Sequence, residues 1–145
     1  MSDTPGGSLL VIAARGRPGV DVERLDRVLA VDRLARRWFS AAEQQAMRAL
    51  PAETARAAFL RLWTAKEASC KATGTGIFGY LAQWTFDVEA QTPVLQSLPA
   101  DAGAAERWHF ERVQPSPEHT AVVAVYDAPG LALNAFRINV ATTEA

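Results

Sequence analysis

Hydrophobic and polar residues alternate at two different periods in the first part of the chain. Residues 8–14 are apolar and rich in β-forming types, glycines and a proline follow them, and residues 20–23 alternate apolar with acidic side chains. This pattern is typical of a β-hairpin. Because strand side chains repeat every two residues, Asp21 and Glu23 are expected on one face of the second strand, opposite two valines.

The pattern then changes to a helical period. Apolar residues recur on one helical face between residues 25 and 38, which predicts a helix over that range. Ser40 and Glu43 form an S-x-x-E capping box, so a second, short helix is predicted to begin there and to end near Leu50. Glu43 is therefore expected to contact the start of its own helix.

A third and longer helix is predicted over residues 52–72. This range contains no glycine or proline, and Pro51 suits the first position of a helix. Gly74 and Gly76 are typical of residues that end a helix. The sequence therefore predicts one uninterrupted helix of about six turns.

Beyond residue 79, short β-rich runs alternate with turn-forming segments. Helices that lie between a hairpin and such strands are typical of an α+β fold, with an antiparallel sheet packed against a long helix and shorter helices. We expect residues 1–145 to form a single domain, with a surface connection over residues 92–105, which are rich in proline, alanine and glycine. The predicted strands are 84–89, 107–113, 120–126 and 135–140.

The composition is that of an ordinary globular domain, with 49% hydrophobic and 21% charged residues. The first residues lack the basic charge of an export signal, and no early apolar run is long enough to span a bilayer. We therefore expect a cytoplasmic protein with no membrane partner. A single cysteine, Cys70, excludes an internal disulfide and a thiolate metal site. The net charge is −1, but the charges are unevenly distributed, because five arginines lie between Arg24 and Arg37. This cluster suits either a solvated helix face or a docking patch.

Three acidic residues and two lysines stand out, although each has an ordinary interpretation. Asp21 and Glu23 suit the solvent face of an edge strand. On the predicted long helix, Glu67 and Lys71 lie one turn apart and suit a surface ion pair worth roughly 0.2–0.5 kcal/mol. Lys66 falls within the apolar stripe of that helix, and its ammonium group would have to extend past the stripe to reach water. Taken singly, these residues leave the function open.

Three segments taken together point to one family. They are G-V-D-V-E at 19–23, W-F-S-A-A-E at 38–43 and W-T-A-K-E-A-S-C-K at 63–71. In order and separation they resemble the signatures of the 4'-phosphopantetheinyl transferase superfamily, G-[IV]-D-x-E, F-[ST]-x-x-E and W-x-x-K-E-[AS]-x-x-K. The resemblance is strongest over residues 8–77. It implies transfer of the phosphopantetheine arm of coenzyme A to a serine of an apo carrier protein, with release of 3',5'-ADP.

The resemblance also implies roles for the charged residues. Asp21, Glu23 and Glu67 would bind Mg²⁺, a hard cation that prefers carboxylate oxygens and bridges pyrophosphate oxygens. Glu67 would also accept the serine proton, directly or through a bound water. Lys66 and Lys71 match lysines that lie near the phosphates, where Lys71 would protonate the leaving group.

The expected partners follow from the same resemblance. They are coenzyme A, whose approach the backbone at Gly74 and Gly76 would allow, and an acyl or peptidyl carrier protein; no nucleic acid is expected. The arginines between Arg24 and Arg37 would then meet the acidic surface of the carrier protein. The alternative is a non-catalytic or split half-domain that binds a carrier protein or needs a separate amino-terminal half.

Two branches of the superfamily differ in how many such units one chain contains. This sequence resembles the carboxy-terminal half of Sfp-type enzymes, but it has the single-half length of holo-acyl-carrier-protein synthase, whose helix end resembles residues 71–77. Residues 2–7 lack the histidine of the S-x-S-H-type motif that the Sfp-type branch has there. The resemblance therefore implies a homo-oligomer with sites between subunits, with a trimer as first choice and a dimer as second.

Overall fold

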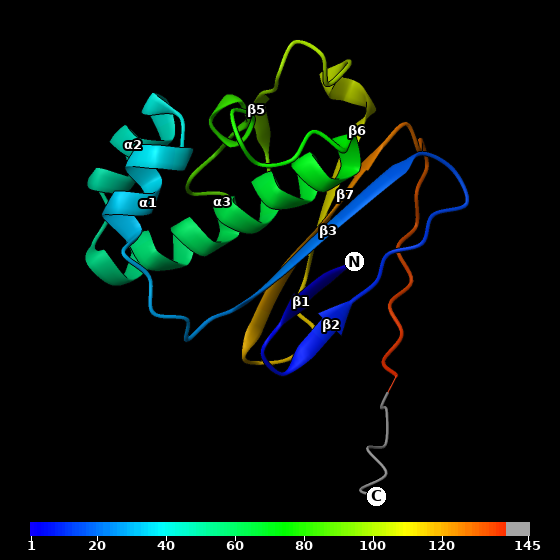
Figure 1. Ribbon diagram of the computed structural model, residues 1–145, viewed down its shortest axis with the longest axis horizontal. Helices are drawn as coiled ribbons and strands as arrows, with labels where there is room; N and C mark the ends of the chain where they lie inside the picture. Colours follow the sequence, from blue (N-terminus) through cyan, green and yellow to red (C-terminus); the bar gives the residue numbers. More distant parts are fainter. Residues whose placement is uncertain (139–145) are drawn as a thin grey trace, which may run out of the picture.

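The computed structural model, which describes residues 1–138, has a three-stranded antiparallel sheet with a long helix across one face (Figure 1). The strand order is β3 (Arg17–Arg24), β7 (His119–Tyr126) and β6 (Trp108–Val113), and the helix is α3 (Ala52–Thr73). Every residue of β7 is buried, because the core beneath α3 covers one face of the sheet and a smaller apolar cluster covers the other. The predicted α+β fold with an antiparallel sheet is confirmed.

Strand β3 carries the predicted acidic residues on the side that faces α3. Asp21 pairs with Val122 and Glu23 pairs with Thr120 in the register of β3 and β7, and Val122 belongs to the core beneath α3. Val20 lies in the apolar cluster on the opposite face. The two-residue period of the strand therefore places both carboxylates on one face, as predicted, and the structure turns that face toward the helix.

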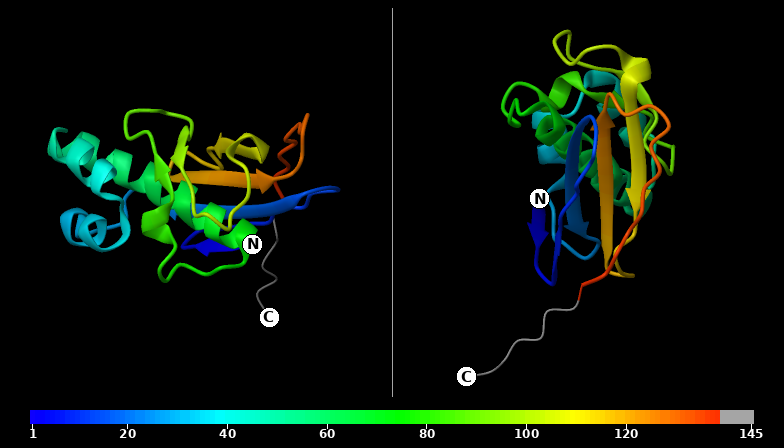
Figure 2. Two further views of the ribbon diagram at one scale, coloured as in Figure 1. Left: turned by 90° about the horizontal axis from the view of Figure 1, so that it is seen from above. Right: turned by 90° about the vertical axis from the view of Figure 1, so that its right-hand side faces the viewer.

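The predicted pairing of residues 8–14 with 20–23 is wrong. Strand β2 (Gly7–Leu9) pairs with β1 (Ser2–Thr4), residues 10–16 form no strand, and β3 pairs along its full length with β7. Burial is the physical reason, since β7 is mostly apolar and is covered on both faces, so that pairing with it removes more apolar surface from water. Strands β1 and β2 lie beside the outer edge of β3, as the right-hand view of Figure 2 shows.

Two short helices, α1 (Val31–Trp38) and α2 (Ala41–Arg48), pack against α3 near its amino-terminal half (Figure 1). The predicted capping box is present, because the Ser40 side chain accepts from the Glu43 N–H and the Glu43 carboxylate accepts from the Ser40 N–H. Helix α1 begins at Val31 instead of residue 25. The backbone N–H of Leu25 instead donates to a carbonyl just before β7 at 2.8 Å, which extends the pairing of the sheet.

The long helix is confirmed, and two glycines determine where it ends and how closely it packs on the sheet. Gly74 ends α3 in the left-handed conformation, with φ of 73°. At Gly19 the backbones of β3 and α3 come close together, since a Cβ there would lie 2.0 Å from the Ala68 carbonyl oxygen and 2.5 Å from the Ala72 nitrogen. Gly19 lies two residues before Asp21. The contact between the two backbones therefore helps to set the distance between the acidic strand and the helix.

The remaining strand predictions hold in part. Strands 107–113 and 120–126 correspond to β6 and β7, each within one residue of the observed bounds. The predicted strand 84–89 is reduced to β4 (Thr85–Phe86), which pairs with β5 (Leu95–Ser97). Strand β5 therefore lies inside the segment that was expected to be only a connection.

The last predicted strand is not found where the structure can test it. Residues 135–138 form no strand, and residues 139–140 lie outside the described residues. Two short 3₁₀ helices, η1 (Leu81–Gln83) and η2 (Ala105–Arg107), complete the elements. Within residues 1–138, none of the helices combines the length and the apolar composition needed to cross a bilayer.

Candidate active site

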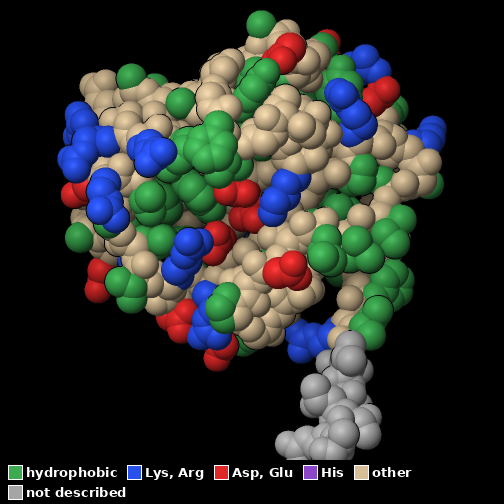
Figure 3. All heavy atoms as spheres, viewed as in Figure 1, with side chains coloured by type: hydrophobic (Ala, Val, Ile, Leu, Met, Phe, Trp, Pro, Cys, Tyr) green, Lys and Arg blue, Asp and Glu red, His purple; other side chains and the backbone are tan. Residues whose placement is uncertain are grey.

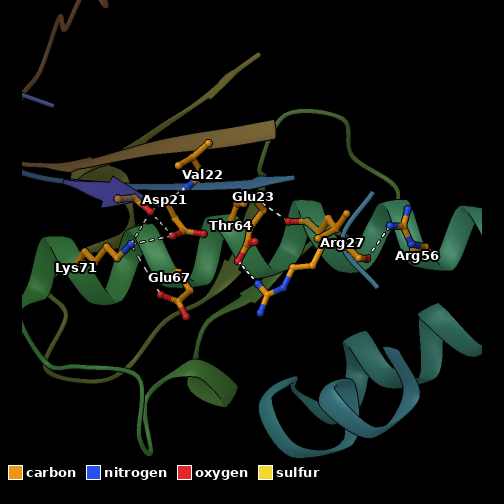
Figure 4. Close-up of polar contacts among 10 residues, drawn as sticks. Asp21, Val22, Glu23, Arg27, Arg56, Thr64, Glu67 and Lys71 are labelled. Atoms are coloured by element: carbon orange, nitrogen blue, oxygen red, sulfur yellow. Dashed lines mark hydrogen bonds and ion pairs between the residues drawn. The ribbon is translucent and has the colours of Figure 1, made fainter. Parts of the chain in front are cut away.

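Three carboxylates and one lysine meet where β3 crosses α3 (Figure 4). Asp21 and Glu23 come from the strand, and Glu67 and Lys71 come from successive turns of the helix. The Lys71 ammonium donates to Asp21 Oδ1 at 2.8 Å and lies 4.0 Å from Glu67 Oε2. In Figure 3, acidic side chains are visible near the middle of the face that Figure 1 shows, with basic side chains around them. The structure thus brings together four of the residues expected in the site.

One oxygen of Asp21 is unusual. Asp21 is buried, and among residues 1–138 its Oδ2 atom has no hydrogen-bond partner, although Oδ1 has two. A buried carboxylate oxygen without a partner costs roughly 1–3 kcal/mol or more, because it has lost its hydration. Such an atom is a natural contact for a ligand that brings a positive charge or a hydrogen-bond donor.

Glu23 is paired with a cation of its own. Arg27 Nη1 donates to Glu23 Oε1 at 2.6 Å, and the Arg27 carbonyl oxygen accepts from the Arg56 guanidinium at 2.8 Å. Burial raises the pKa of the Glu23 carboxyl above its usual value, against the lowering effect of Arg27, and the nearby Asp21 charge raises it further. Glu23 therefore belongs to a region where negative charge is concentrated.

Glu67 has the same character. Its side chain is 16% exposed, and burial raises the pKa of the Glu67 carboxyl, with the Asp21 charge as the next cause and Lys71 opposing both. A carboxylate that holds a proton more tightly than usual is a better base at neutral pH. Glu67 shares this property with Glu23, but its nearest cation among the described residues, Lys71, is 4.0 Å away, whereas Arg27 lies 2.6 Å from Glu23, so Glu67 is the freer of the two to accept a proton.

The cluster fits a hard divalent cation by its chemistry, since it offers carboxylate oxygens and the unpartnered Oδ2 of Asp21. Among residues 1–138, however, no three or more His, Cys, Asp or Glu side chains are arranged so that they could hold a metal ion as they stand. Lys71 and Arg27 occupy one oxygen each of Asp21 and Glu23. Binding of a cation by all three carboxylates would thus need side-chain rotations, in which Asp21 offers its unpartnered Oδ2 while Oδ1 keeps its contact with Lys71.

Lys66 is not in this cluster. Its side chain is fully buried, and its ammonium lies 2.7 Å from Glu43 Oε2 and donates to the carbonyl oxygens of Leu81 (2.9 Å) and Trp84. The side chain thus neither reaches water nor points to a place where a phosphate could bind. The expected phosphate contact of Lys66 is not supported, because the local structure uses its charge to join α3 to α2 and to the chain before β4.

The glycines after α3 lie on an open surface. Among the described residues, no atom would lie within 4 Å of a Cβ added at Gly74 or Gly76, and both have a positive φ. The ending of the helix accounts for Gly74. A role of either glycine in binding coenzyme A stays a prediction.

The basic patch expected between Arg24 and Arg37 is divided by the structure. Arg24 pairs with Asp26, and Arg27 pairs with Glu23. Helix α1 presents the other three arginines, which are exposed, at Arg33, Arg36 and Arg37. Among the described residues, the arginines of this patch that have no ion pair are therefore those of α1.

One site residue escaped the sequence analysis. Ser2 is buried on β1, its hydroxyl donates to Asp21 Oδ1 at 2.9 Å, and it accepts from the Lys71 ammonium at 3.1 Å. In the sequence, residues 2–7 are notable only for the histidine that they lack, and a single serine carries no periodic signal that points to such a contact. Only the position of β1 beside the edge of β3 brings it there.

Known proteins resemble this chain in sequence and in fold. The 4'-phosphopantetheinyl transferase HetI of Nostoc sp. is 34% identical over 107 residues, which cover 74% of this chain and 42% of that protein. The 4'-phosphopantetheinyl transferase psf-1 of Bacillus pumilus is 43% identical over 82 residues, which cover 56% and 34%. The chain thus spans less than half the length of both relatives.

A solved structure shares the fold. The crystal structure of Thermotoga maritima holo-[acyl-carrier-protein] synthase superposes with a TM-score of 0.58 over 77% of this chain and 62% of that chain, at 24% identity. The family model described as the 4'-phosphopantetheinyl transferase superfamily matches residues 17–125, which include β3, all three α-helices and β7 up to its penultimate residue. The chain therefore belongs to the 4'-phosphopantetheinyl transferase superfamily.

Proposed function

We propose that this protein transfers the 4'-phosphopantetheine arm of coenzyme A to a serine of an apo carrier protein in a magnesium-dependent reaction that releases 3',5'-ADP. Membership of the superfamily and the names of the relatives support the reaction class. The observation that carries the proposal is the cluster in which Asp21, with its unpartnered oxygen, and Glu67 both lie beside the Lys71 ammonium.

Glu67 is the proposed base. The acceptor serine gives its hydroxyl proton to the Glu67 carboxylate while its oxygen forms a bond to the β-phosphorus of coenzyme A. The bond from that phosphorus to the bridging oxygen breaks, and 3',5'-ADP leaves. The raised pKa of Glu67, caused first by burial, favours proton uptake at neutral pH.

Lys71 is the proposed partner of the leaving group. Its ammonium is held within the cluster, and its side chain is 34% exposed, so a ligand can reach this lysine from the solvent. A positive charge at this place offsets the charge that develops on the departing diphosphate, and an ammonium proton can be transferred to it. Asp21 holds the amine in position through the contact at 2.8 Å.

Asp21, Glu67 and Glu23 are the proposed ligands of Mg²⁺. The bound cation would neutralise charge on the pyrophosphate of coenzyme A. Saturating Mg²⁺, at 100 times its dissociation constant, should stabilise the protein by about 2.7 kcal/mol, which corresponds to a rise in Tm of roughly 5–11 °C. Asp21→Asn should lose this rise, whereas Glu89→Gln, a change at an exposed acid, should keep it.

The carrier protein is proposed to dock on α1. The exposed arginines of α1, Arg36 and Arg37 among them, would attract the acidic surface of the carrier protein around the modified serine and would raise the rate of association. The variant with Arg36→Ala and Arg37→Ala should raise KM for the carrier protein without lowering kcat. Arg15→Ala, on the exposed segment before β3, is the control.

Coenzyme A is proposed to bind between subunits of a homo-oligomer, a trimer first and a dimer second. The loop after α3 supports this, because its backbone is open at Gly74 and Gly76 and Phe78 is 74% exposed. An exposed aromatic ring beside open backbone suits a surface that a second subunit or a ligand covers. Light scattering of the active protein tests the proposal, and full activity of a monomer would contradict it.

Transfer itself is tested by mass spectrometry. The protein is incubated with coenzyme A, Mg²⁺ and a panel of apo carrier proteins, and the expected result is a carrier protein that has gained the phosphopantetheine arm. Glu67→Gln should abolish transfer and Lys71→Ala should reduce kcat at least about 100-fold, whereas Glu89→Gln should not change it. Absence of transfer to every carrier protein, at concentrations that allow assembly, would refute the proposal.

A further inference from the structure

The Ser2 hydroxyl lies at the junction of three groups of the site. It donates to Asp21 Oδ1 at 2.9 Å, and it accepts from the Lys71 ammonium at 3.1 Å and from the Val22 backbone N–H at 3.3 Å. A serine hydroxyl has one hydrogen to donate and two lone pairs to accept with, so its hydrogen-bonding capacity is fully used. Ser2 is 6% exposed, so these hydrogen bonds are buried and do not belong to a mobile side chain at the surface.

The hairpin that carries Ser2 is attached to the sheet at its turn. His119 Nε2, on β7, lies 3.2 Å from the Pro5 carbonyl oxygen, and His119 Nδ1 lies 2.8 Å from Ser116 Oγ. Because a carbonyl oxygen only accepts, Nε2 carries the hydrogen of this contact, and in the neutral imidazole Nδ1 accepts from the serine hydroxyl. The position of β1 is therefore held from the strand at the centre of the sheet, independently of the acidic cluster.

The arrangement has a consequence for Asp21. Rotation about the last side-chain bond of an aspartate is soft, and without a constraint both oxygens can turn toward the same cation. Ser2 and Lys71 both contact Oδ1, and Oδ2 remains without a partner among residues 1–138. The serine thus keeps the carboxylate from turning its second oxygen to the lysine.

We propose that Ser2 is a positioning residue, which orients the Asp21 carboxylate and the Lys71 ammonium so that Asp21 Oδ2 stays available to Mg²⁺. The inference rests on the proposed function, because it concerns the same site. Residues 1–16 lie outside the segment that matches the superfamily, so this contact adds a residue to the site from beyond that segment. Groups that orient metal ligands typically change metal affinity 10–100-fold when they are removed.

The experiment compares Ser2→Ala with Ser2→Thr, which keeps a hydroxyl, and with Ser8→Ala, an exposed serine of the same hairpin. Titration calorimetry measures the dissociation constant of Mg²⁺ alone, without coenzyme A or carrier protein. The expected result is a rise of about tenfold in Ser2→Ala and a change of less than about twofold in the other two variants. Amide hydrogen exchange at Val22 should become faster in Ser2→Ala only, because its N–H then loses its acceptor.

The outcomes separate this inference from the proposed function. An unchanged Mg²⁺ affinity in Ser2→Ala, or a loss of affinity that Ser2→Thr does not restore, overturns the positioning role. Faster exchange at Val22 without a change in affinity also overturns it, since the hydroxyl then only completes the edge of β3. If the wild-type protein transfers nothing, the proposed function is refuted. If Ser2→Ala nevertheless binds Mg²⁺ more weakly than the wild type, the inference is still supported.

Discussion

Replacement of Lys66 by methionine should destabilise the protein strongly, although it removes a charge from an apolar site. The Lys66 side chain is fully buried, and its ammonium contacts Glu43, two carbonyl oxygens and the face of the Phe39 ring, whose centroid lies 5.0 Å away. Burial lowers the pKa of Lys66 and Glu43 opposes this. The buried carboxylate therefore depends on the ammonium for compensation of its charge.

The magnitude follows from what Lys66→Met leaves behind. Glu43 would keep hydrogen bonds from the Ser40 N–H and hydroxyl and from the Phe86 N–H, at 2.9, 3.0 and 2.9 Å, but would have no opposite charge within the buried pair. Removal of one partner of a buried pair costs about 3–5 kcal/mol. For a chain of this size, 4 kcal/mol corresponds to a fall in Tm of roughly 8–16 °C.

Urea unfolding followed by tryptophan fluorescence measures this cost, since the chain has four tryptophans. Glu43→Gln combined with Lys66→Met should be about 1–3 kcal/mol more stable than the sum of the single changes predicts, because the double variant buries no lone charge. Asp26→Asn, in an exposed ion pair, is the control and should cost less than about 1 kcal/mol. A loss of transfer activity with unchanged stability in Lys66→Met would refute this reasoning and return Lys66 to the phosphate site.

Three further predictions concern the contact of β3 with α3 and the charges beside it. Gly19→Ala should cost about 3 kcal/mol in urea unfolding, because its Cβ would overlap the helix backbone, whereas Gly7→Ala, where the described residues leave the space open, should change stability by less than about 1 kcal/mol; equal costs would contradict the close approach. Burial raises the pKa of Glu67 in the folded state. The protonated Glu67 side chain therefore contributes to folding stability below its unfolded-state pKa, about 4.5, and this contribution is lost as the pH rises through the raised pKa of the folded state. In metal-free buffer, Glu67→Gln should therefore lose less stability than the wild type between pH 4.5 and pH 7, and parallel curves would argue against burial as the cause. Reductive methylation of the native protein should modify Lys71 and spare Lys66, the chain's other lysine, until urea unfolds it; modification of Lys66 in the native state would contradict its burial.

Helices α2 and α3 could be predicted from the sequence because their signals are local, whereas the grouping of Glu67 and Lys71 with the acids of β3 was implied by the resemblance to a known family. The capping box at Ser40, the unbroken run after Pro51 and the glycine at 74 define two helices through contacts between near neighbours in the chain. The two-residue period of β3 likewise places Asp21 and Glu23 on one face, whatever strand pairs with it.

Tertiary structure alone decided the rest, because it depends on partners far away in the chain. Strand β3 pairs with β7, about one hundred residues later, since that pairing buries more apolar surface than a local hairpin would. The helical period shows that Glu67 and Lys71 share one face, which Lys71 uses to contact Asp21. It could not predict that Lys66 pairs with the buried Glu43, because Glu43 belongs to another helix. The contact of Ser2 with the acidic cluster exists only because a hairpin, held by His119, lies along the free edge of β3.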